Sequence, residues 1–335
     1  MSTLELTVDG PAGPRTVRVS NPDRVVFPAR GITKAEVVRY VVAVGDGALR
    51  ALRERPTTLE RWPAGVQPGF RLAVWKGRPG DAFFQRRVPR GAPAWVQTVR
   101  VESPDGSAVD SVCPTEVAVL AWAANLGTLT FHPWPVRRAH LDRPDQLLVD
   151  LDPQPGTGFA EAVEVARELR ALLAELGMEG LPKTSGARGL HVIVPVAPHW
   201  GFADVQRARV ALGAALVRRM PRLATSAWHK HDRGARVYVD CTPPTVAAAY
   251  SVRPVAAATV SAPLRWDELD DAAPDDLDVR TMPPRFAAVG DLHAGVDEPL
   301  GSIEALLEMA DRDDSGHGRD RAGWDGGRDR AGRDR

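Results

Sequence analysis

Two carboxylates stand at the end of an apolar run, where they could bind a metal ion. Asp150 and Asp152 follow residues 146–149, which read as a buried strand. On a strand, residues two apart point to the same face, so both carboxylates are expected to converge. An Asp pair followed by proline is also typical of a solvated turn, and the pair alone does not decide between these readings.

A second segment carries groups that bind phosphate. Residues 183–191 read Lys-Thr-Ser-Gly-Ala-Arg-Gly-Leu-His, followed by a strand-like apolar run. Glycines let backbone N–H groups approach phosphate oxygens, and Ser185 and Arg188 supply further donors. A third acid, Asp240, closes the strand-like residues 236–239. Three carboxylates at strand ends beside a phosphate-binding loop predict a metal-dependent nucleotidyl-transfer site.

Composition sets the broad class of the chain. Its 335 residues are 44% hydrophobic and carry no formal net charge, which predicts a globular protein with one large core or two smaller ones. No long apolar run and no basic-then-apolar leader are present, so a cytoplasmic location without a membrane is expected. Residues 50–100 are basic and 264–314 acidic. This asymmetry suggests a face for a polyanion, although both stretches also fit ordinary solvated surfaces.

The rare lysines direct attention to a second anion site. The chain has only four lysines, at 34, 76, 183 and 230, among 43 basic residues. Thr33 and Glu36 form a capping box that predicts a helix start, with Lys34 in its first turn near Arg24. Free N–H groups and the helix dipole favour an anion there, so a phosphate pocket is expected. The alternative is an exposed lysine after an ordinary cap.

Other side chains have both a binding and a structural reading. Phe83 and Phe84 are adjacent within the basic stretch, so at least one faces away from the core of a one-sided strand and could stack on bases. A strand buried on both faces would explain them equally. His132 follows a short strand, and a lone histidine is more often structural than catalytic. The loop at 228–233 holds Lys230 and Arg233, which favour an anion over a metal.

Periodicity predicts helices and a tail. Apolar spacing indicates helices at 114–126, 159–177 and 203–219, and the order strand, helix, strand between 146 and 196 is βαβ-like. Residues 311–335 hold seven Asp and seven Arg. Such a segment cannot bury a core, so a disordered charged tail is expected.

The ordered motifs resemble those of the archaeo-eukaryotic primase superfamily, and more closely the polymerase module of bacterial ligase D, which acts in non-homologous end joining. The resemblance runs from about residue 19 to 269. Its motifs are Asp23-Arg24-Val25-Val26-Phe27-Pro28, Arg61-Trp62-Pro63, Phe83-Phe84, Asp150-Leu151-Asp152-Pro153, the 185–191 loop, Val239-Asp240 and Tyr250-Ser251-Val252-Arg253. No Lys-x-Asp-Gly ligase motif is present, so a stand-alone polymerase is expected.

This resemblance implies a role for each matching position. Asp150, Asp152 and Asp240 would be the catalytic acids holding two Mn²⁺ or Mg²⁺ ions. The implied nucleotide-binding residues are Ser185, Arg188, His191, Arg253, His132, Lys230 and Arg233. Arg24 and Lys34 would hold a DNA 5′-phosphate, and Phe83 and Phe84 would contact the template. The implied substrates are NTP or dNTP, with ribonucleotides preferred.

The resemblance also implies a fold and partners. It implies an α+β protein with an RRM-like catalytic core of mixed, largely antiparallel sheet, packed on an N-terminal α/β half. The expected primase-polymerase domain spans 1–310, with halves at about 1–139 and 140–260 and a helical segment at 261–310. Expected partners are gapped, overhanging or broken DNA, a Ku-type end binder and a separate ATP-dependent DNA ligase, at the nucleoid.

Two positions depart from the family pattern. Glu60 stands where such modules can carry Lys, which removes one possible phosphate contact, and Arg24 stands where the best-known members have Lys. Arg is at least as good a phosphate ligand as Lys, so catalytic activity is expected to survive both changes. The property that the two changes put in question is the affinity for nucleotide.

The same residues are compatible with other functions. Primer synthesis is the nearest one. A glycosyltransferase also uses Asp-x-Asp with a metal, but the phosphate loop and the third acid argue against it. A non-catalytic scaffold that binds DNA ends is disfavoured because all three acids are present.

Overall fold

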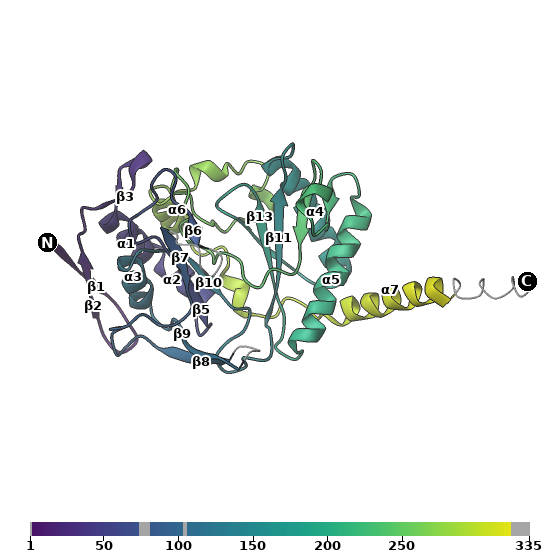
Figure 1. Ribbon diagram of the computed structural model, residues 1–335, viewed down its shortest axis with the longest axis horizontal. Coiled ribbons are helices and arrows are strands. Elements are labelled where there is room, and N and C mark those ends of the chain that lie inside the picture. The colour runs from purple at the N-terminus through teal and green to yellow at the C-terminus, as the bar shows by residue number, and fades with distance from the viewer. Residues whose placement is uncertain (1, 74–80, 103–105, 323–335) are drawn as a thin grey trace, which may run out of the picture.

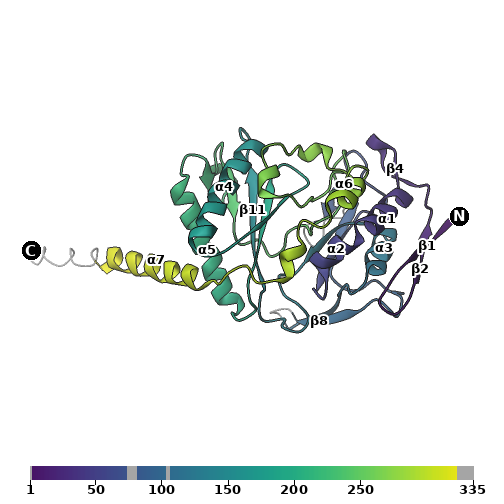
Figure 2. The same ribbon diagram turned by 180° about the vertical axis from the view of Figure 1, so that it is seen from behind.

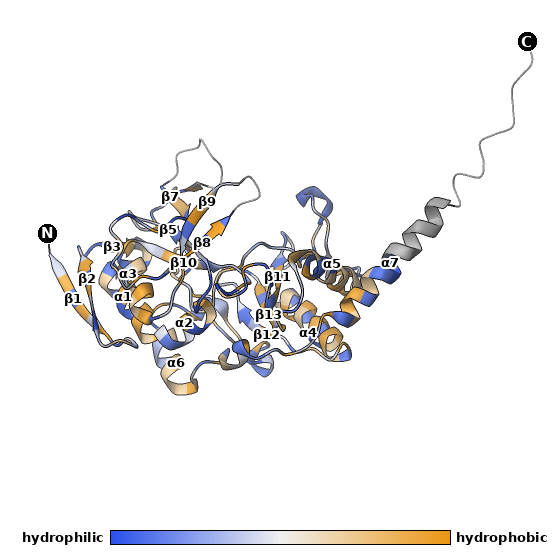
Figure 3. Cartoon of the chain, turned by 90° about the horizontal axis from the view of Figure 1, so that it is seen from below, coloured by the Kyte–Doolittle hydropathy of each residue, from blue (hydrophilic) through white to orange (hydrophobic). Residues whose placement is uncertain are grey.

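The computed structural model describes residues 2–73, 81–102 and 106–322, with side chains to residue 313. Two halves lie side by side, the first half (residues 2–139) and the second half (residues 140–240), as Figures 1 and 2 show from opposite sides. Each half has its own hydrophobic core, and in Figure 3 hydrophobic residues gather in both. The mixed α+β fold with largely antiparallel sheets is as predicted.

The first half is built on a curved sheet covered by helices. The sheet has the order β6-β7-β5-β9-β8, with β10 also paired to β5. Helices α1, α2 and α3 contribute most of their apolar residues to its core. The bounds are β1 (Thr3–Val8), β2 (Arg15–Ser20), β3 (Val25–Phe27), β4 (Ile32–Thr33), α1 (Lys34–Ala43), α2 (Gly45–Leu52), β5 (Thr57–Arg61), β6 (Leu72–Ala73), β7 (Ala82–Gln85), β8 (Thr98–Glu102), β9 (Ala108–Val112), α3 (Val117–Asn125) and β10 (Thr128–Pro133).

The second half is a five-stranded sheet with two helices on one face. The strand order is β12-β13-β11-β15-β14, and β11 is central. Leu147, Val149 and Leu151 of β11 share one core with α4 and α5, whereas Leu148 belongs to another cluster. Because side chains alternate along a strand, Asp150 and Asp152 lie on the face that α4 and α5 leave open. The bounds are β11 (Gln146–Pro153), α4 (Phe159–Glu175), β12 (Leu181–Thr184), β13 (Leu190–Pro195), α5 (Phe202–Arg219), β14 (Ala224–Thr225) and β15 (Val237–Asp240).

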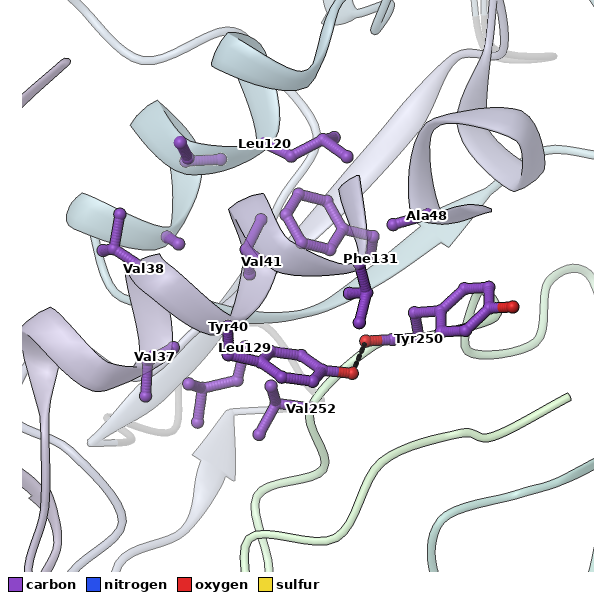
Figure 4. Packing of buried hydrophobic residues seen from close by; sticks show 14 of the residues in the cluster. Val37, Val38, Tyr40, Val41, Ala48, Leu120, Leu129, Phe131, Tyr250 and Val252 are labelled. Carbon is purple, nitrogen blue, oxygen red and sulfur yellow. Dashed lines mark hydrogen bonds between the residues drawn. The ribbon is translucent and has the colours of Figure 1, made fainter. Parts of the chain in front are cut away.

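After β15 the chain returns to the first half. Residues 248–262 pack in the first core, not the second. Ala248 N–H donates to Phe131 O, and the Tyr40 hydroxyl donates to Tyr250 O at 2.7 Å (Figure 4). The predicted catalytic half of about 140–260 therefore included a stretch that belongs to the other core. Its apolar, alanine-rich sequence fits the close approach to β10, which no local pattern reveals.

The last helices also differ from expectation. Helix α6 (Met282–Val289) is followed by α7 (Glu304–Ala322), which extends away from the body in Figures 1 and 2. The predicted disordered tail began at residue 311, but the helix continues through that position. Ion pairs from Arg207 to Asp311 and from Arg218 to Asp313 join α5 to α7, which explains the longer helix. Residues 323–335 of the expected tail lie outside the described residues.

The described ranges contain no helix that is both long and apolar enough to cross a membrane.

Candidate active site

A row of four ionisable side chains crosses the open face of the second sheet. Directly opposite residues in the strand register are Lys183 and His191, His191 and Asp150, and Asp150 and Asp240. Opposite residues in an antiparallel pair point to the same face. The register of β12, β13, β11 and β15 therefore brings the histidine of the 185–191 loop and two of the three acids together.

A buried hydrogen-bond chain fixes His191. Lys183 Nζ lies 2.6 Å from His191 Nδ1 and donates to Ser261 Oγ, also at 2.6 Å. Ser261 Oγ in turn donates to Thr184 O. On the other side of the imidazole ring, Nε2 lies 3.4 Å from Asp150 Oδ1.

These contacts define the proton positions on His191. Burial, and then the charge of Lys183, hold the pKa of His191 well below its ordinary value. A neutral imidazole has one donor and one acceptor, so Nδ1 accepts from Lys183 and Nε2–H points to Asp150. Burial, followed by Arg253, likewise lowers the pKa of Lys183, and a neutral amine still supplies both donated bonds. Sequence reasoning gave Lys183 no role. The signal was its position opposite His191 across the loop of a hairpin.

The three carboxylates repel one another electrostatically. Burial, then the charges of Asp152 and Asp240, raise the pKa of Asp150 to about 7. Asp152 accepts a hydrogen bond from Gln154 Nε2 at 2.9 Å, and Asp240 accepts one from Thr242 N at 2.8 Å. Each acid is thus paired with a different neighbour.

The donor set suits a hard divalent cation. Carboxylate oxygens are the ligands that Mg²⁺ and Mn²⁺ prefer, and a cation would offset the repulsion that raises the pKa of Asp150. In the part of the chain that the structure describes, no three His, Cys, Asp or Glu side chains stand close enough to enclose an ion as they are. The oxygen donors of the three acids and their shared sheet face fit a metal.

Hydrogen bonds within the 185–191 loop fix its shape and leave the Ser185 hydroxyl free to donate. Ser185 Oγ accepts from the backbone N–H groups of Ala187 and Gly189, so its own hydroxyl proton is left to donate. Gly186 has φ 70°, and a Cβ there would collide with the side chain of Arg253. A Cβ on Gly189 would collide with the carbonyl of Leu151. Glycine at both positions therefore lets the loop approach Arg253 and β11.

Two arginines flank the acids. Arg253, in the segment that returns to the first half, has a buried Nε without a hydrogen-bond partner among the described residues. The charges of Glu60 and Asp150 act on its guanidinium, although burial dominates and lowers its pKa. Arg188 is exposed, and its guanidinium lies 3.9 Å from Asp152 Oδ1. Both are placed to meet an anionic ligand brought to the acids.

A cleft of about 650 Å³ lies between the halves. Its walls come from β5, β7 and β10 of the first half, from α5 of the second half, and from the loop that follows β15. Phe84 and His132 line it with their rings 5.3 Å apart, edge to face. Phe83 instead lies under the guanidinium of Arg61. Both phenylalanines are partly exposed, at 37% and 41%, so a strand buried on both faces is excluded.

His132 is held by a residue that sequence reasoning treated as a loss. Glu60 accepts hydrogen bonds from His132 Nε2 at 2.9 Å and from Trp62 Nε1 at 3.0 Å. Glu60 lies on β5, and Trp62 follows the end of that strand two residues later, a spacing that favours a shared face. The pairing with His132 comes from the strand register and has no local signal.

The predicted 5′-phosphate residues lie in the first half, apart from the acids. The capping box of Thr33 and Glu36 is present and starts α1 at Lys34. Lys34 is buried and its ammonium donates to Ser20 O and Ser20 Oγ. Burial, and then the charge of Arg24, lower the pKa of Lys34 to about 8. The Nε of Arg24 is buried without a partner among the described residues.

The loop beside β15 separates its two cationic residues. Lys230 is exposed. Arg233 is buried, donates to Ala227 O and Trp228 O, and stacks 3.3 Å above the ring of Tyr238. Because Tyr238 is the cross-strand neighbour of Asp152, Arg233 connects this loop to the acids through a packed ring. Its Nε and one terminal nitrogen are already bonded to the loop itself.

Comparison with known proteins identifies the family of the chain. Residues 33–293 match the LigD primase-polymerase domain family. The chain is 33% identical to the multifunctional non-homologous end joining protein LigD of Mycolicibacterium smegmatis, covering 84% of this chain and 36% of that protein. It is 28% identical to the bifunctional LigD of Bacillus subtilis, covering 84% of this chain and 45% of that protein. The chain thus spans less than half the length of these relatives.

A solved structure shares the fold. The polymerase domain of Mycobacterium tuberculosis ligase D, in complex with DNA, superposes with a TM-score of 0.73 at 31% identity, covering 83% of this chain and 97% of that one. The chain therefore belongs to the LigD primase-polymerase domain family, a family of DNA-repair nucleotidyltransferases.

Proposed function

We propose that this chain extends the 3′ end of a DNA primer strand by template-directed nucleotidyl transfer, with ribonucleotides preferred, at gaps and broken ends that await joining. The observation that carries the proposal is the row from Lys183 through His191 and Asp150 to Asp240, which faces away from α4 and α5 beside the phosphate loop. The described relative bound to DNA supports a DNA substrate. A Ku-type end binder, a separate ligase and a nucleoid location belong to the same proposal.

The protein's own side chains would bind the incoming nucleotide and orient it against the DNA. Ser185, Arg188 and Arg253 supply donors for the triphosphate, and His191 holds an N–H beside the acids. Phe83 and Phe84 offer partly exposed rings for template bases, and exposed Lys230 and the loop held by Arg233 stand near the primer or nucleotide.

The metal ions complete this arrangement. Two Mn²⁺ or Mg²⁺ ions held by Asp150, Asp152 and Asp240 would activate the primer hydroxyl and neutralise the leaving pyrophosphate. The positive groups around the acids limit the repulsion between the carboxylates and the incoming triphosphate.

Primer extension tests the proposal. Labelled NTP or dNTP is supplied with gapped and overhanging DNA, and the wild type is compared with the double variant Asp150→Ala, Asp152→Ala. Extension should be abolished while DNA binding is largely kept, because phosphate contacts away from the acids carry affinity. The matched control is Asp142→Asn, an exposed acid that pairs with its neighbour Arg143. Primer extension by the double variant in the presence of Mn²⁺ would contradict the assignment of these two acids as metal ligands.

A further inference from the structure

Glu60 is a buried carboxylate with two fixed donors. It lies on β5 with 3% of its surface exposed. Burial opposes its ionisation, but the hydrogen bonds from His132 and Trp62, together with neighbouring charges such as that of Arg253, lower the pKa of the Glu60 carboxyl group. A buried charge persists only where it is paired and hydrogen-bonded, so these two contacts account for the charged residue in the sheet.

The two contacts leave one arrangement of protons. The indole N–H of Trp62 can only donate, so Glu60 Oε1 must accept. Glu60 Oε2 then accepts from His132 Nε2, because an ionised carboxylate has no donor. In a neutral imidazole the other ring nitrogen, Nδ1, carries a lone pair. Among the described residues, Nδ1 of His132 makes no hydrogen bond.

The position of His132 gives that lone pair a function. Its ring lines the cleft of about 650 Å³, packed edge-on against Phe84. His132 is also near enough to His191 to influence the pKa of that imidazole. Nucleotides carry few hydrogen-bond donors, and the sugar hydroxyls are the donors that both purines and pyrimidines share.

We propose that Glu60 is a positioning residue that holds His132 with its proton on Nε2, so that Nδ1 accepts a hydrogen bond from a sugar hydroxyl of the bound nucleotide. The second half of this statement rests on the proposed function, and the first half does not. Glu60, in the position where related modules can carry Lys, thus gives up a possible phosphate contact. In its place it orients His132 to accept a hydrogen bond from the sugar.

The first test needs neither nucleotide nor catalysis. Nitrogen-15 NMR of the free protein reports which imidazole nitrogen of His132 is protonated. The wild type should carry the proton on Nε2. In Glu60→Gln the amide oxygen is drawn to the Trp62 N–H and the amide N–H₂ faces His132, so the proton should move to Nδ1. Trp62→Phe removes the competing donor and should leave the proton on Nε2, as should the surface control Glu54→Gln.

The second test measures nucleotide binding. Affinities of wild type and Glu60→Gln are compared for ATP and its 2′-deoxy and 3′-deoxy analogues. Removing the hydroxyl that Nδ1 reads should weaken wild-type binding about five- to tenfold, the worth of one hydrogen bond, and should not weaken binding by Glu60→Gln.

The outcomes are separable. A proton on Nδ1 in the wild type, or an unchanged proton position in Glu60→Gln, overturns the positioning role. A changed proton position with the same sugar preference in both proteins overturns the reading of the hydroxyl. If the wild type binds no nucleotide and extends no primer, the proposed function fails, while the NMR result still decides the role of Glu60.

Discussion

Lys183 and His191 face each other across β12 and β13, with Lys183 Nζ 2.6 Å from His191 Nδ1. The pair turns the N–H of His191 toward Asp150 and ties the phosphate loop to the acids. Burying an amine is costly, so the lysine at this position, in a chain with four lysines, points to a role in the site and not in stability.

Replacing this lysine should affect catalysis more than folding. In Lys183→Met the Nδ1 acceptor loses its donor, and His191 is free to change tautomer. Primer extension should fall roughly 10- to 100-fold, the usual cost of losing a residue that orients a ligand of the site. Thermal unfolding should change little, because the variant no longer buries an amine. Ser261→Ala, which removes only the second acceptor of Lys183, should lower the rate less. Wild-type rates in Lys183→Met would contradict the role.

The stability of the metal-free protein should depend on Asp150 and on pH. Its pKa of about 7 in the folded protein lies above the ordinary 3.8. Between these values the folded protein holds a proton that the unfolded chain has released, so stability falls as pH rises from about 4 to 7. The side chain is 32% exposed, so water reduces the effect. We expect Asp150→Asn to be more stable by about 1–2 kcal/mol at pH 8.

Two conditions check this interpretation. The difference in stability between Asp150→Asn and wild type should be much smaller near pH 4, where the wild-type carboxyl is protonated in the folded protein and nearly half protonated in the unfolded chain. Millimolar Mn²⁺ should narrow the difference at pH 8, because a cation bound by the wild type stabilises its folded state. Denaturant unfolding across the pH range measures both. Equal stability of the two proteins at pH 8 without metal would show that the acids do not repel.

Short sequence patterns predicted those features that depend only on residues close together in the chain. The capping box at Thr33 and Glu36 placed the start of α1, and the alternation along β11 placed Asp150 and Asp152 on one face. Helix α4 begins at Phe159, as its apolar spacing predicted. These features follow from periods of 2 and 3.6 residues, which a sequence displays directly.

Long-range pairing set the features that the sequence did not reveal. Glu60 and His132 are 72 residues apart, and they meet because β5 and β10 pair antiparallel. The return of residues 248–262 to the first core likewise depends on contacts with β10. Register between distant strands depends on the whole core, so no local pattern shows that a glutamate will meet a histidine.

The proposed 5′-phosphate pocket should be sensitive to pH. Lys34 has a pKa of about 8, against an ordinary 10.5, so it loses its charge about two pH units earlier than an exposed lysine. A terminal phosphate becomes a dianion above about pH 6. The preference for gapped DNA with a 5′-phosphate should therefore be greatest between about pH 6 and 8 and decline above pH 8.

Two variants test the pocket. Lys34→Arg keeps its charge at all these pH values, so any preference that it retains should no longer decline above pH 8. Lys34→Ala should lose the preference for phosphorylated DNA. Binding titrations on gapped DNA with and without the phosphate measure both. Equal weakening on the two substrates in Lys34→Ala would make this lysine a general backbone contact, and a wild-type preference that is constant to pH 9.5 would exclude its titration.

Removing residues 311–335 should cost little stability. In the described part of this segment, Asp311 and Asp313 pair with Arg207 and Arg218 of α5, and all four side chains are at least 41% exposed. Exposed ion pairs are worth about 0–1 kcal/mol each. A chain that ends at Ala310 keeps Ile303 and Leu306 in the core, so its melting temperature should fall by no more than about 3 °C. Raising the salt provides the control, since loss of ion pairs should shrink the difference in melting temperature.

Primer extension at limiting DNA should be unchanged by the same truncation, because interleaved Asp and Arg cancel most of the electrostatic field of the segment beyond about 8 Å at physiological salt. A several-fold loss of extension rate on truncation would mean that the segment binds DNA.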